Sequence, residues 1–263
     1  MKRQSIELHN LQVSYDKTIV IPKLDLVIPS GKVTIIIGPN GCGKSTLLKT
    51  IGRMITPRRG EVLLNGESIR ALSPKEAARR MAVLPQSPVI PEGLLVRELI
   101  AYGRYPYQSS MGGLKKDDLE IIDWAMKSTG VYEFADRLVA ELSGGQRQRV
   151  WISMTLAQKT DILVLDEPTT YLDMANQLEI LTLLRILNRS LGVTLLIVMH
   201  ELNNAVKFAD HIIGMKAGEI LFAGQPGQVI TKENLKGLYD INAALQIDEE
   251  GGYPVCINYE LAN

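Results

Sequence analysis

The segment Gly38-Pro-Asn-Gly-Cys-Gly-Lys-Ser45 decides the fold of this chain. It matches the pattern G-x-x-x-x-G-K-[ST] at every defined position. Before it stands Val33–Ile37, a compact β-branched run typical of a buried strand, and after it apolar residues recur at helical spacing from Leu47 to Ile55. Glycines in such a loop let backbone N–H groups surround an anion, and the positive end of the following helix adds to the attraction. The segment therefore predicts a phosphate-binding loop in an α/β fold.

Two side chains of this loop have defined roles in the prediction. Lys44 supplies a positive charge for the β- and γ-phosphates of ATP, and the Ser45 hydroxyl can ligate Mg²⁺. Cys42 is interpreted as a small loop residue, because no partner side chain suggests a catalytic thiol. The other positions expected to contact the nucleotide are Gly38, Pro39, Asn40, Gly41, Cys42, Gly43 and Thr46.

A pair of carboxylates follows a second apolar run. Ile162–Leu165 is typical of a buried strand and leads directly into Asp166 and Glu167. In an α/β sheet, ligands bind at the carboxyl ends of the strands. We therefore expect Asp166 in the Mg²⁺ shell, and Glu167 as the group that polarises a water molecule aimed at the γ-phosphate.

Two more polar residues stand at the ends of strand-like runs. His200 follows Val193–Met199, where a neutral imidazole could contact the γ-phosphate and orient the attacking water. Gln86 follows Met81–Leu84, where it could link the metal to the helical segment that begins there. Alone, a glutamine carries almost no information, and a capping or surface histidine is the default interpretation. Together with the phosphate loop and Glu167, the two residues predict a hydrolytic site.

Outside these motifs the chain alternates between strand and helix patterns. Strand-like runs thin out between about residues 73 and 159, where helical patterns with Gly and Pro interruptions dominate. The pattern predicts an α/β fold with a P-loop NTPase (RecA-like) core, a mainly parallel sheet, N-terminal antiparallel strands and an inserted α-helical subdomain. Further strands are expected at Leu8–Tyr15, Ile19–Ile28, Glu61–Leu64, His211–Met215, Glu219–Phe222 and Tyr253–Tyr259, and a helix is expected with Leu178, Leu181 and Leu184 on one face.

Composition narrows the classes of function. Lysine plus arginine equals aspartate plus glutamate at 29 each, so no overall charge favours nucleic acid. Cys42 and Cys256 match no metal-ligand spacing and suit a reducing cytosolic compartment. Met1–Val20 lacks the apolar core of a secretory signal, and the longest apolar runs fall far short of the roughly 20 residues that span a bilayer. We expect any membrane role to be exerted from the cytoplasmic side, with another chain spanning the membrane.

A second glycine-rich helix start lies in the helical segment. Ser143 is a good N-cap, and Gly144 and Gly145 expose backbone N–H groups ahead of Gln146 and a helix-like run. The pattern is typical of a phosphate site, about 100 residues from the first loop. One nucleotide can use both sites only if the helical segment folds back or a second subunit supplies it. The residues alone leave both arrangements open.

The motifs resemble the ABC transporter ATPase family in order and spacing, over nearly the whole chain. The segments that carry the resemblance are Gly38–Ser45, Gln86, Leu142–Gln146, Ile162–Glu167, Leu172–Asp173 and His200. It implies a head-to-tail homodimer that holds two ATP molecules, each between the phosphate loop of one subunit and Ser143–Gln146 of the other. It also implies that Tyr15 stacks on adenine. We expect a single ABC ATPase domain over residues 1–263, with a catalytic core at 1–86 and 161–240, a helical subdomain at 87–160 and a C-terminal tail at 241–263.

Finer matches resemble the importer ATPases for ferric siderophores, haem and cobalamin, and the ferric-siderophore members above all. They are Gly38–Lys44, Tyr102–Pro106, Thr169–Asp173 and Glu201–Ala205. The resemblance implies an integral membrane permease docked near Tyr102–Pro106, an indirect link to a substrate-binding protein, no nucleic acid, and a peripheral location at the cytoplasmic face of the cell membrane. Two residues depart from the pattern: Glu201 stands where relatives usually have Asp, and Asn176 where many have His.

Three other functions are alternatives to ferric-siderophore import. A haem or cobalamin importer ATPase fits the same residues. A non-transport ABC ATPase, such as an iron–sulfur assembly or nucleic-acid-handling member, is disfavoured by the absence of a long coiled-coil insertion, the single cassette and the balanced charge. A nucleotide-binding scaffold without turnover is disfavoured by the complete set of Glu167, His200 and Gln86. The tail at 241–263 is expected to pack on the core rather than to regulate it.

Overall fold

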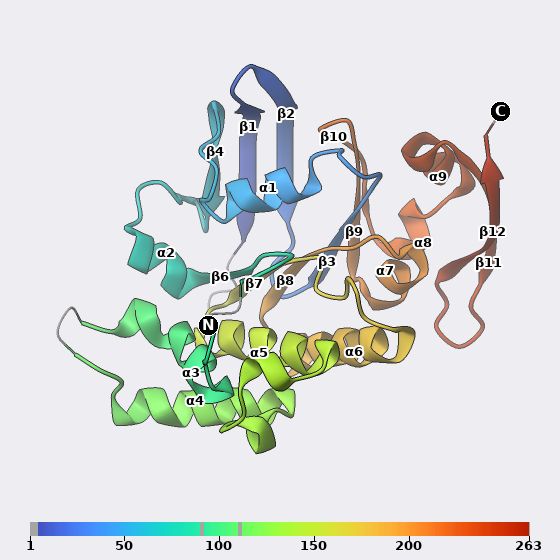
Figure 1. Cartoon of the computed structure of the whole chain (residues 1–263). Coiled ribbons are helices and arrows are strands. Elements are labelled where there is room, and N and C mark those ends of the chain that lie inside the picture. The colour runs from blue at the N-terminus through green and yellow to red at the C-terminus, as the bar shows by residue number, and fades with distance from the viewer. Residues whose placement is uncertain (1–4, 90–91, 110–111, 263) are drawn as a thin grey trace.

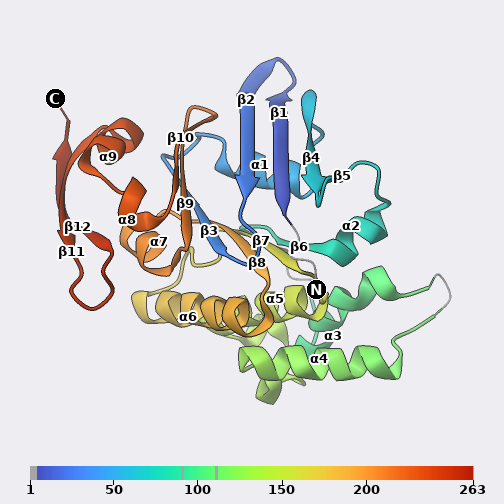
Figure 2. The same ribbon diagram turned by 180° about the vertical axis from the view of Figure 1, so that it is seen from behind.

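The computed structural model describes residues 5–89, 92–109 and 112–262. A central sheet separates two layers of the molecule. The long helices α5 (Gly144–Ala157) and α6 (Met174–Leu191) run along one side of it, and α1 (Lys44–Ile51) and the N-terminal strands lie on the other, as Figures 1 and 2 show from opposite sides. This arrangement is the layered α/β fold that the alternation of strands and helices predicts.

The central sheet, within the described residues, consists of β3 (Val33–Ile37), β6 (Met81–Leu84), β7 (Ile162–Asp166), β8 (Thr194–Val198), β9 (His211–Lys216) and β10 (Glu219–Gly224). Their order is β10-β9-β3-β8-β7-β6, and every neighbouring pair except β10 and β9 is parallel. β3, β7 and β8 are buried at every position, which explains their continuous apolar runs, since both faces of the sheet are covered. The predicted parallel core is confirmed.

A second sheet is antiparallel and N-terminal. Its strands are β1 (Ile6–Tyr15), β2 (Thr18–Ile28), β4 (Arg59–Leu64) and β5 (Glu67–Ser68), in the order β2-β1-β4-β5. Asn65 and Gly66 link β4 to β5 at φ 54° and 77°, the left-handed conformations that this pair adopts in tight hairpins. Leu47 and Leu48 of α1 pack in one apolar cluster with this sheet and the central one. Ile55, expected in the helix, lies beyond its end at Ile51.

The chain between β6 and β7 is helical. In the described residues it holds α3 (Val96–Ala101), α4 (Lys116–Thr129), α5, and 3₁₀ helices at Tyr102–Tyr107, Tyr132–Phe134 and Val139–Glu141. It holds no strand there beyond one isolated bridge. Val150 and Trp151 of α5 share an apolar cluster with Leu163 and Leu195 of the sheet. No helix of the described ranges combines the length and the apolar character that a membrane crossing needs. The inserted helices are therefore packed against the sheet through α5.

The remaining helices connect and cover the sheet. They are α2 (Pro74–Arg80), α6, α7 (Leu202–Phe208), α8 (Pro226–Val229) and α9 (Lys232–Tyr239). On α6, Leu181 and Leu184 are each 1% exposed, whereas Leu178 is 38% exposed at the margin of the predicted face. The tail forms a hairpin of β11 (Ile241–Ile247), which the sequence patterns did not indicate, and β12 (Pro254–Leu261), which confirms the strand expected at Tyr253–Tyr259.

Candidate nucleotide site

The phosphate loop joins β3 to α1 through two glycines in unusual conformations. Gly38 has φ 154° and Gly43 has φ 107°, in a region that L side chains rarely adopt. A Cβ at Gly38 would also lie 2.0 Å from the carbonyl oxygen of Met215 in β9. Gly43 is the N-cap of α1 and offers no side chain to its first turn, so the N–H groups of that turn are available to an anion.

Lys44 lies buried over the loop. It is 5% exposed, and its Nζ donates hydrogen bonds of 2.9 Å each to the carbonyl oxygens of Gly38 and Pro39. The Sγ of Cys42 lies 4.0 Å from this ammonium group, and burial raises the pKa of the Cys42 thiol. The thiol therefore stays protonated at neutral pH, which fits the interpretation of Cys42 as a packing residue of the loop.

Asp166 stands at the end of β7, next to the loop. Its Oδ1 accepts a hydrogen bond of 3.1 Å from the Ser45 hydroxyl. Burial raises the pKa of the Asp166 carboxyl, and the neighbouring Glu167 adds to the rise against the opposing effect of Ser45. Carboxylate and hydroxyl oxygens are ligands that suit Mg²⁺. Ser45 and Asp166 are therefore the side chains at the end of β7 that could hold a magnesium ion.

Glu167 is the centre of a cluster of polar side chains. It is 9% exposed and has φ 51°, a strained conformation of the kind found at functional sites. Its Oε2 accepts hydrogen bonds from Gln86 Nε2 at 2.5 Å and from Thr170 Oγ1 at 3.0 Å. The imidazole Nε2 of His200 contacts its Oε1. The structure thus brings together Glu167, His200 and Gln86, and adds Thr170, which the sequence analysis quoted only as part of a motif.

A cavity of 260 Å³ opens between the loop and this cluster. The residues that line it are Val20, Asn40, Gly41, Gly43, Lys44, Ser45, Thr46, Glu167 and His200. All but Val20 were expected to contact nucleotide or water. Val20 was missed because the β1–β2 hairpin, and not any local motif, carries it to the loop. Tyr15 is not part of this lining: it is 46% exposed at the end of β1, and its contact with adenine stays a prediction.

Residues from the C-terminal half support the loop from behind. The N–H of Gly218, after β9, donates a 2.9 Å hydrogen bond to the Cys42 carbonyl. Tyr239, at the end of α9, lies against the backbone of Gly38. Its hydroxyl is buried without a hydrogen bond of normal geometry in the described part of the chain, and burial raises the pKa of Tyr239 to about 12. No sequence signal could have found this contact, since the two segments are far apart in the chain.

The second glycine-rich helix start lies apart from this cavity. The Ser143 hydroxyl accepts a hydrogen bond of 3.3 Å from the Gln146 N–H, and Gln146 Oε1 accepts one of 3.0 Å from the Ser143 N–H. These two bonds form a capping box at the start of α5. A Cβ at Gly145 would lie 2.3 Å from Oδ1 of Asn176, so glycine lets α5 approach α6 closely. Within the described residues, Ser143–Gln146 contribute nothing to the lining of the phosphate-loop cavity.

The chain is similar to known proteins in sequence and in structure. Residues 21–170 match the family model described as ABC transporter. The chain is 48% identical over 257 residues to the iron(3+)-hydroxamate import ATP-binding protein FhuC of Bacillus subtilis (strain 168), covering 98% of this chain and 96% of that protein. It is 45% identical over 247 residues to the ferric enterobactin transport ATP-binding protein FepC of Escherichia coli (strain K12), covering 94% and 91%. The chain belongs to the ABC transporter family, and it is an ATPase of that family.

Solved structures agree with this assignment. The dimeric structure of MJ0796, a bacterial ABC transporter cassette, matches with a TM-score of 0.74 at 30% identity, over 84% of this chain and 98% of that chain. The same cassette, as a dimer in a post-hydrolysis state bound to ADP and Pi, matches with a TM-score of 0.73 at 28% identity and the same coverage, 84% and 98%. The predicted P-loop fold is confirmed, and ATP is the nucleotide of this chain.

Proposed function

We propose that this chain hydrolyses ATP with Mg²⁺ at the phosphate loop and thereby drives import of an iron chelate, a ferric siderophore, through a separate membrane permease. The observation that carries the hydrolytic part is the convergence of Gln86, Thr170 and His200 on the Glu167 carboxylate beside the cavity. A scaffold that only binds nucleotide needs no carboxylate fixed by three side chains at that place.

The loop residues bind the phosphates in this proposal. The N–H groups from Gly41 to Thr46 point at the phosphates, and Lys44 exchanges its two carbonyl partners for β- and γ-phosphate oxygens, which form stronger charge-assisted hydrogen bonds. Ser45 and Asp166 hold Mg²⁺ together with Gln86, and the ion neutralises charge on the phosphates when it is bound. The hydroxyl, carboxylate and amide oxygens of these three side chains supply the hard ligands that Mg²⁺ requires.

Glu167 performs the chemical step in this proposal. Its carboxylate accepts a hydrogen bond from a water molecule and takes up its proton as the water oxygen attacks the γ-phosphorus in line. The bond from that phosphorus to the β–γ bridging oxygen breaks, and ADP and inorganic phosphate are the products. His200 orients the same water and contacts the γ-phosphate, which its place in the cavity lining supports. The hydrogen bonds of Gln86 and Thr170 hold the carboxylate in one orientation, so no reorganisation is needed during the reaction.

A second copy of the chain completes the site in this proposal. Ser143–Gln146 form a helix start in which the N–H groups of Gly144 and Gly145 lie outside the capping box, and within the described residues they take no part in the cavity lining of their own chain. In a head-to-tail homodimer they cover the γ-phosphate bound to the partner's loop, and Tyr15 stacks on adenine. The dimeric state of the similar cassette MJ0796 supports this arrangement.

The permease docks on the helical subdomain in this proposal. The 3₁₀ helix at Tyr102–Tyr107 displays two aromatic rings, Tyr102 and Tyr105, which are 55% and 64% exposed. Between them Arg104 is 5% exposed, and it donates hydrogen bonds of 2.8 Å to Asp118 Oδ1 and to the Ala157 carbonyl. Exposed aromatic rings on a fixed backbone are suited to a protein interface. The chain then lies at the cytoplasmic face of the cell membrane, with the core at 1–86 and 161–240 carrying the chemistry and the segment 87–160 the docking surface.

The cargo is proposed from the relatives. Iron(3+)-hydroxamate and ferric enterobactin, the compounds in the names of two relatives at 48% and 45% identity, are both ferric siderophores. A substrate-binding protein outside the membrane delivers such a chelate to the permease, and this chain never contacts it. An importer of haem or cobalamin is the second candidate, since the motifs of this chain also resemble those of the ATPases of such importers.

Uptake of radioactive iron tests the proposal. Cells that lack this chain are complemented with the wild type, with Glu167→Gln or with an empty vector, and each receives ⁵⁵Fe bound to a hydroxamate siderophore, to haem or to no carrier. We expect uptake from the hydroxamate with the wild type alone. Uptake from haem but not from the hydroxamate would move the cargo to the second candidate. Equal uptake in all three strains, with ATPase activity retained by the purified wild type, would remove import from the proposal.

A further inference from the structure

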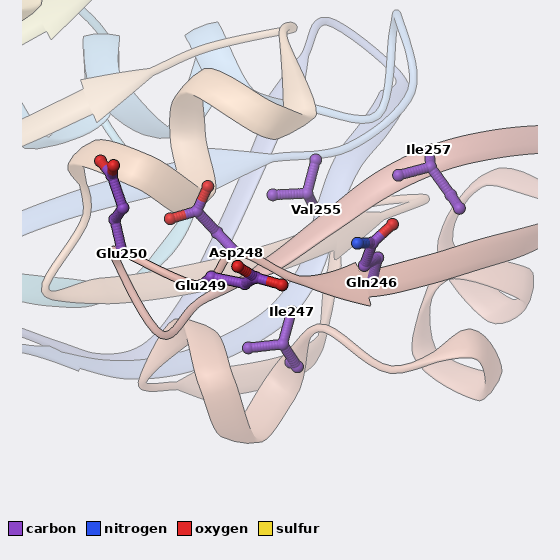
Figure 3. A pocket seen from close by; sticks show the side chains of 7 residues that line it. All are labelled: Gln246, Ile247, Asp248, Glu249, Glu250, Val255 and Ile257. Carbon is purple, nitrogen blue, oxygen red and sulfur yellow. The ribbon is translucent and has the colours of Figure 1, made fainter.

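The C-terminal hairpin of β11 and β12 stands outside both larger sheets. Within the described residues it forms a two-stranded sheet of its own, and such a hairpin is marginally stable unless other elements fix it. Its loop end carries Asp248, Glu249 and Glu250 beside a hollow of 420 Å³ with Ile247 and Val255 (Figure 3). That end is exposed. The contacts that fix the hairpin lie instead along the strands, against α7 and α9.

The first attachment lies behind the phosphate loop. Lys216 Nζ donates hydrogen bonds of 2.8 Å each to the Gly237 carbonyl and to Asp240 Oδ2, at the end of α9. Lys216 follows Met215, whose carbonyl oxygen would lie 2.0 Å from a Cβ at Gly38. β11 begins at the residue after Asp240. The start of the hairpin is therefore held at a fixed position relative to the phosphate loop.

The second attachment is a pair of hydrogen bonds from one side chain. Asn203 Nδ2 donates to the Cys256 carbonyl at 3.0 Å, and Asn203 Oδ1 accepts from the Cys256 N–H at 2.9 Å. The amide side chain thus occupies both backbone groups of one residue of β12, as a neighbouring strand would. An aspartate or a leucine at position 203 could not make both bonds. The side chain is specific for this contact.

Asn203 belongs to the helix that follows His200. α7 begins at Leu202, two residues after His200, and Asn203 lies in its first turn. The N-cap residue Glu201 makes no side-chain hydrogen bond to that turn, where a shorter aspartate is a better cap. α7 has seven residues, too few to hold its own N-terminal position without tertiary contacts. The contact with Cys256 provides one.

The neighbouring Asn204 fixes the same turn from the other side. Its Nδ2 donates to Gln177 Oε1 at 3.3 Å, and Gln177 Nε2 donates to the Leu172 carbonyl at 3.1 Å. Leu172 lies five residues after Glu167. The first turn of α7 is therefore held between the hairpin and the segment that follows Glu167, so a shift of the hairpin would be transmitted to His200.

We propose that Asn203 is a positioning residue for ATP hydrolysis. It fixes the first turn of α7 to the C-terminal hairpin, which is itself attached behind the phosphate loop, and so it holds His200 at the Glu167 carboxylate. The inference rests on the proposed hydrolytic role of Glu167 and His200. It gives the tail at 241–263 a function in turnover, beyond the packing role expected from the sequence.

Steady-state kinetics of Asn203→Leu test the inference. The variant keeps the size of the side chain and loses both hydrogen bonds. We expect kcat to fall about tenfold, because His200 is no longer fixed in the reactive orientation, while the dissociation constant of ATP stays within about twofold. Asn242→Leu, the same exchange at an exposed asparagine of β11, is the control and should leave kcat unchanged. Asn203→Asp, which retains the acceptor for the Cys256 N–H alone, should show the same loss.

A double-mutant cycle separates positioning from general destabilisation. In the His200→Ala background, Asn203→Leu should lower the residual turnover by less than about twofold, because its effect passes through His200. The amide of Cys256 should exchange faster with D₂O in Asn203→Leu than in the wild type. Wild-type kcat in both Asn203 variants, or a tenfold loss that persists without His200, would overturn the inference. A wild-type protein without ATPase activity would instead contradict the proposed function.

Discussion

Two glycine-rich helix starts in this molecule look alike in sequence and differ in structure. At the start of α1, Gly43 leaves the first turn uncapped, and Lys44, Asp166 and Glu167 surround it. At the start of α5, the turn is closed by its own capping box between Ser143 and Gln146. The first start lies in a cavity with the groups needed to bind and cleave a phosphate. The second presents backbone N–H donors, and its capping contacts involve only Ser143 and Gln146, with no lysine or carboxylate.

The difference teaches how the site is divided. Uncapped N–H groups next to a lysine and two carboxylates form a binding site within one chain. A capped helix start satisfies part of its own hydrogen bonding and can still offer the remaining N–H groups to a ligand that arrives already bound elsewhere. We infer that the α1 start holds the nucleotide first, and that the α5 start of a second copy closes over it. Substitutions can therefore perturb one helix start and leave the other intact.

The largest effect is expected at Glu167. Glu167→Gln keeps the shape and the contacts with Thr170 and Gln86 but removes the proton acceptor, so kcat should fall roughly 10³-fold, within the range of a general base. The affinity for ATP should not change, because the α1 start is intact. Phosphate release under single-turnover conditions measures the loss, and equilibrium binding of a fluorescent ATP analogue serves as the control. Hydrolysis at the wild-type rate would remove Glu167 from the chemistry.

A smaller effect, on binding, is expected at Lys44. Lys44→Ala removes a charged donor to the phosphates and should weaken ATP binding roughly 10- to 100-fold, the range for a hydrogen bond to a charged group. Lys32→Ala, at an exposed lysine before β3, is the matched exchange and should bind normally. Isothermal titration calorimetry measures both. Unchanged affinity in Lys44→Ala would break the assignment of the α1 start as the primary phosphate site.

A tenfold effect is expected at Thr170. Thr170→Val keeps the shape of the side chain and removes the hydrogen bond of 3.0 Å to Glu167 Oε2, so kcat should fall by about tenfold at constant ATP affinity. Thr182→Val, at an exposed position of α6, is the control. The ratio of the two kcat values gives the contribution of the hydroxyl. Equal kcat values would show that Gln86 and His200 orient Glu167 without Thr170.

At Tyr239 the expected effect concerns stability, and it appears only at high pH. Burial raises the pKa of Tyr239 from 10.0 to about 12. As the pH rises through this range, the tyrosine of the unfolded chain loses its proton first, so the unfolded state is stabilised relative to the folded state. Tyr239→Phe removes this penalty. The free energy of unfolding of the variant should therefore exceed that of the wild type by roughly 2 kcal/mol near pH 11.5, with little difference below pH 10.

Urea unfolding at pH 8 and at pH 11.5 measures this difference for Tyr239→Phe. The same exchange at Tyr259, which is 68% exposed, controls for the general effect of alkali on tyrosine. An equal loss of stability in the wild type and in Tyr239→Phe between the two pH values would contradict a buried, protonated hydroxyl behind Gly38.

The sequence predicts the part of the site in which function constrains neighbouring residues. The phosphate loop, the acids after Ile162–Leu165 and the histidine after Val193–Met199 each follow a buried strand, and parallel strands bring their carboxyl ends to one edge. For the same reason the core strands could be placed to within one or two residues. The gathering of Glu167, Gln86 and His200 follows from the strand order alone.

The remainder depends on contacts between distant segments. Val20 reaches the cavity because the β1–β2 hairpin carries it there, and Tyr239 reaches Gly38 from the end of α9. Asn203 of α7 contacts Cys256 of β12. No sequence pattern marks these contacts, because the side chain that fills a given position can come from any element that the fold brings near. β11 was missed since its mixed polar and apolar residues lack the alternation of a half-buried strand.

The mass of Glu167→Gln in solution with saturating ATP and Mg²⁺ tests the central claim most directly. The variant binds nucleotide without cleaving it, so a site shared between two copies should hold them together. Light scattering should then show about twice the 29.1 kDa of the single chain, and Ser143→Arg in the same chain should return the mass to the monomer value. A mass of 29.1 kDa for Glu167→Gln with ATP bound would contradict a site completed by a second copy.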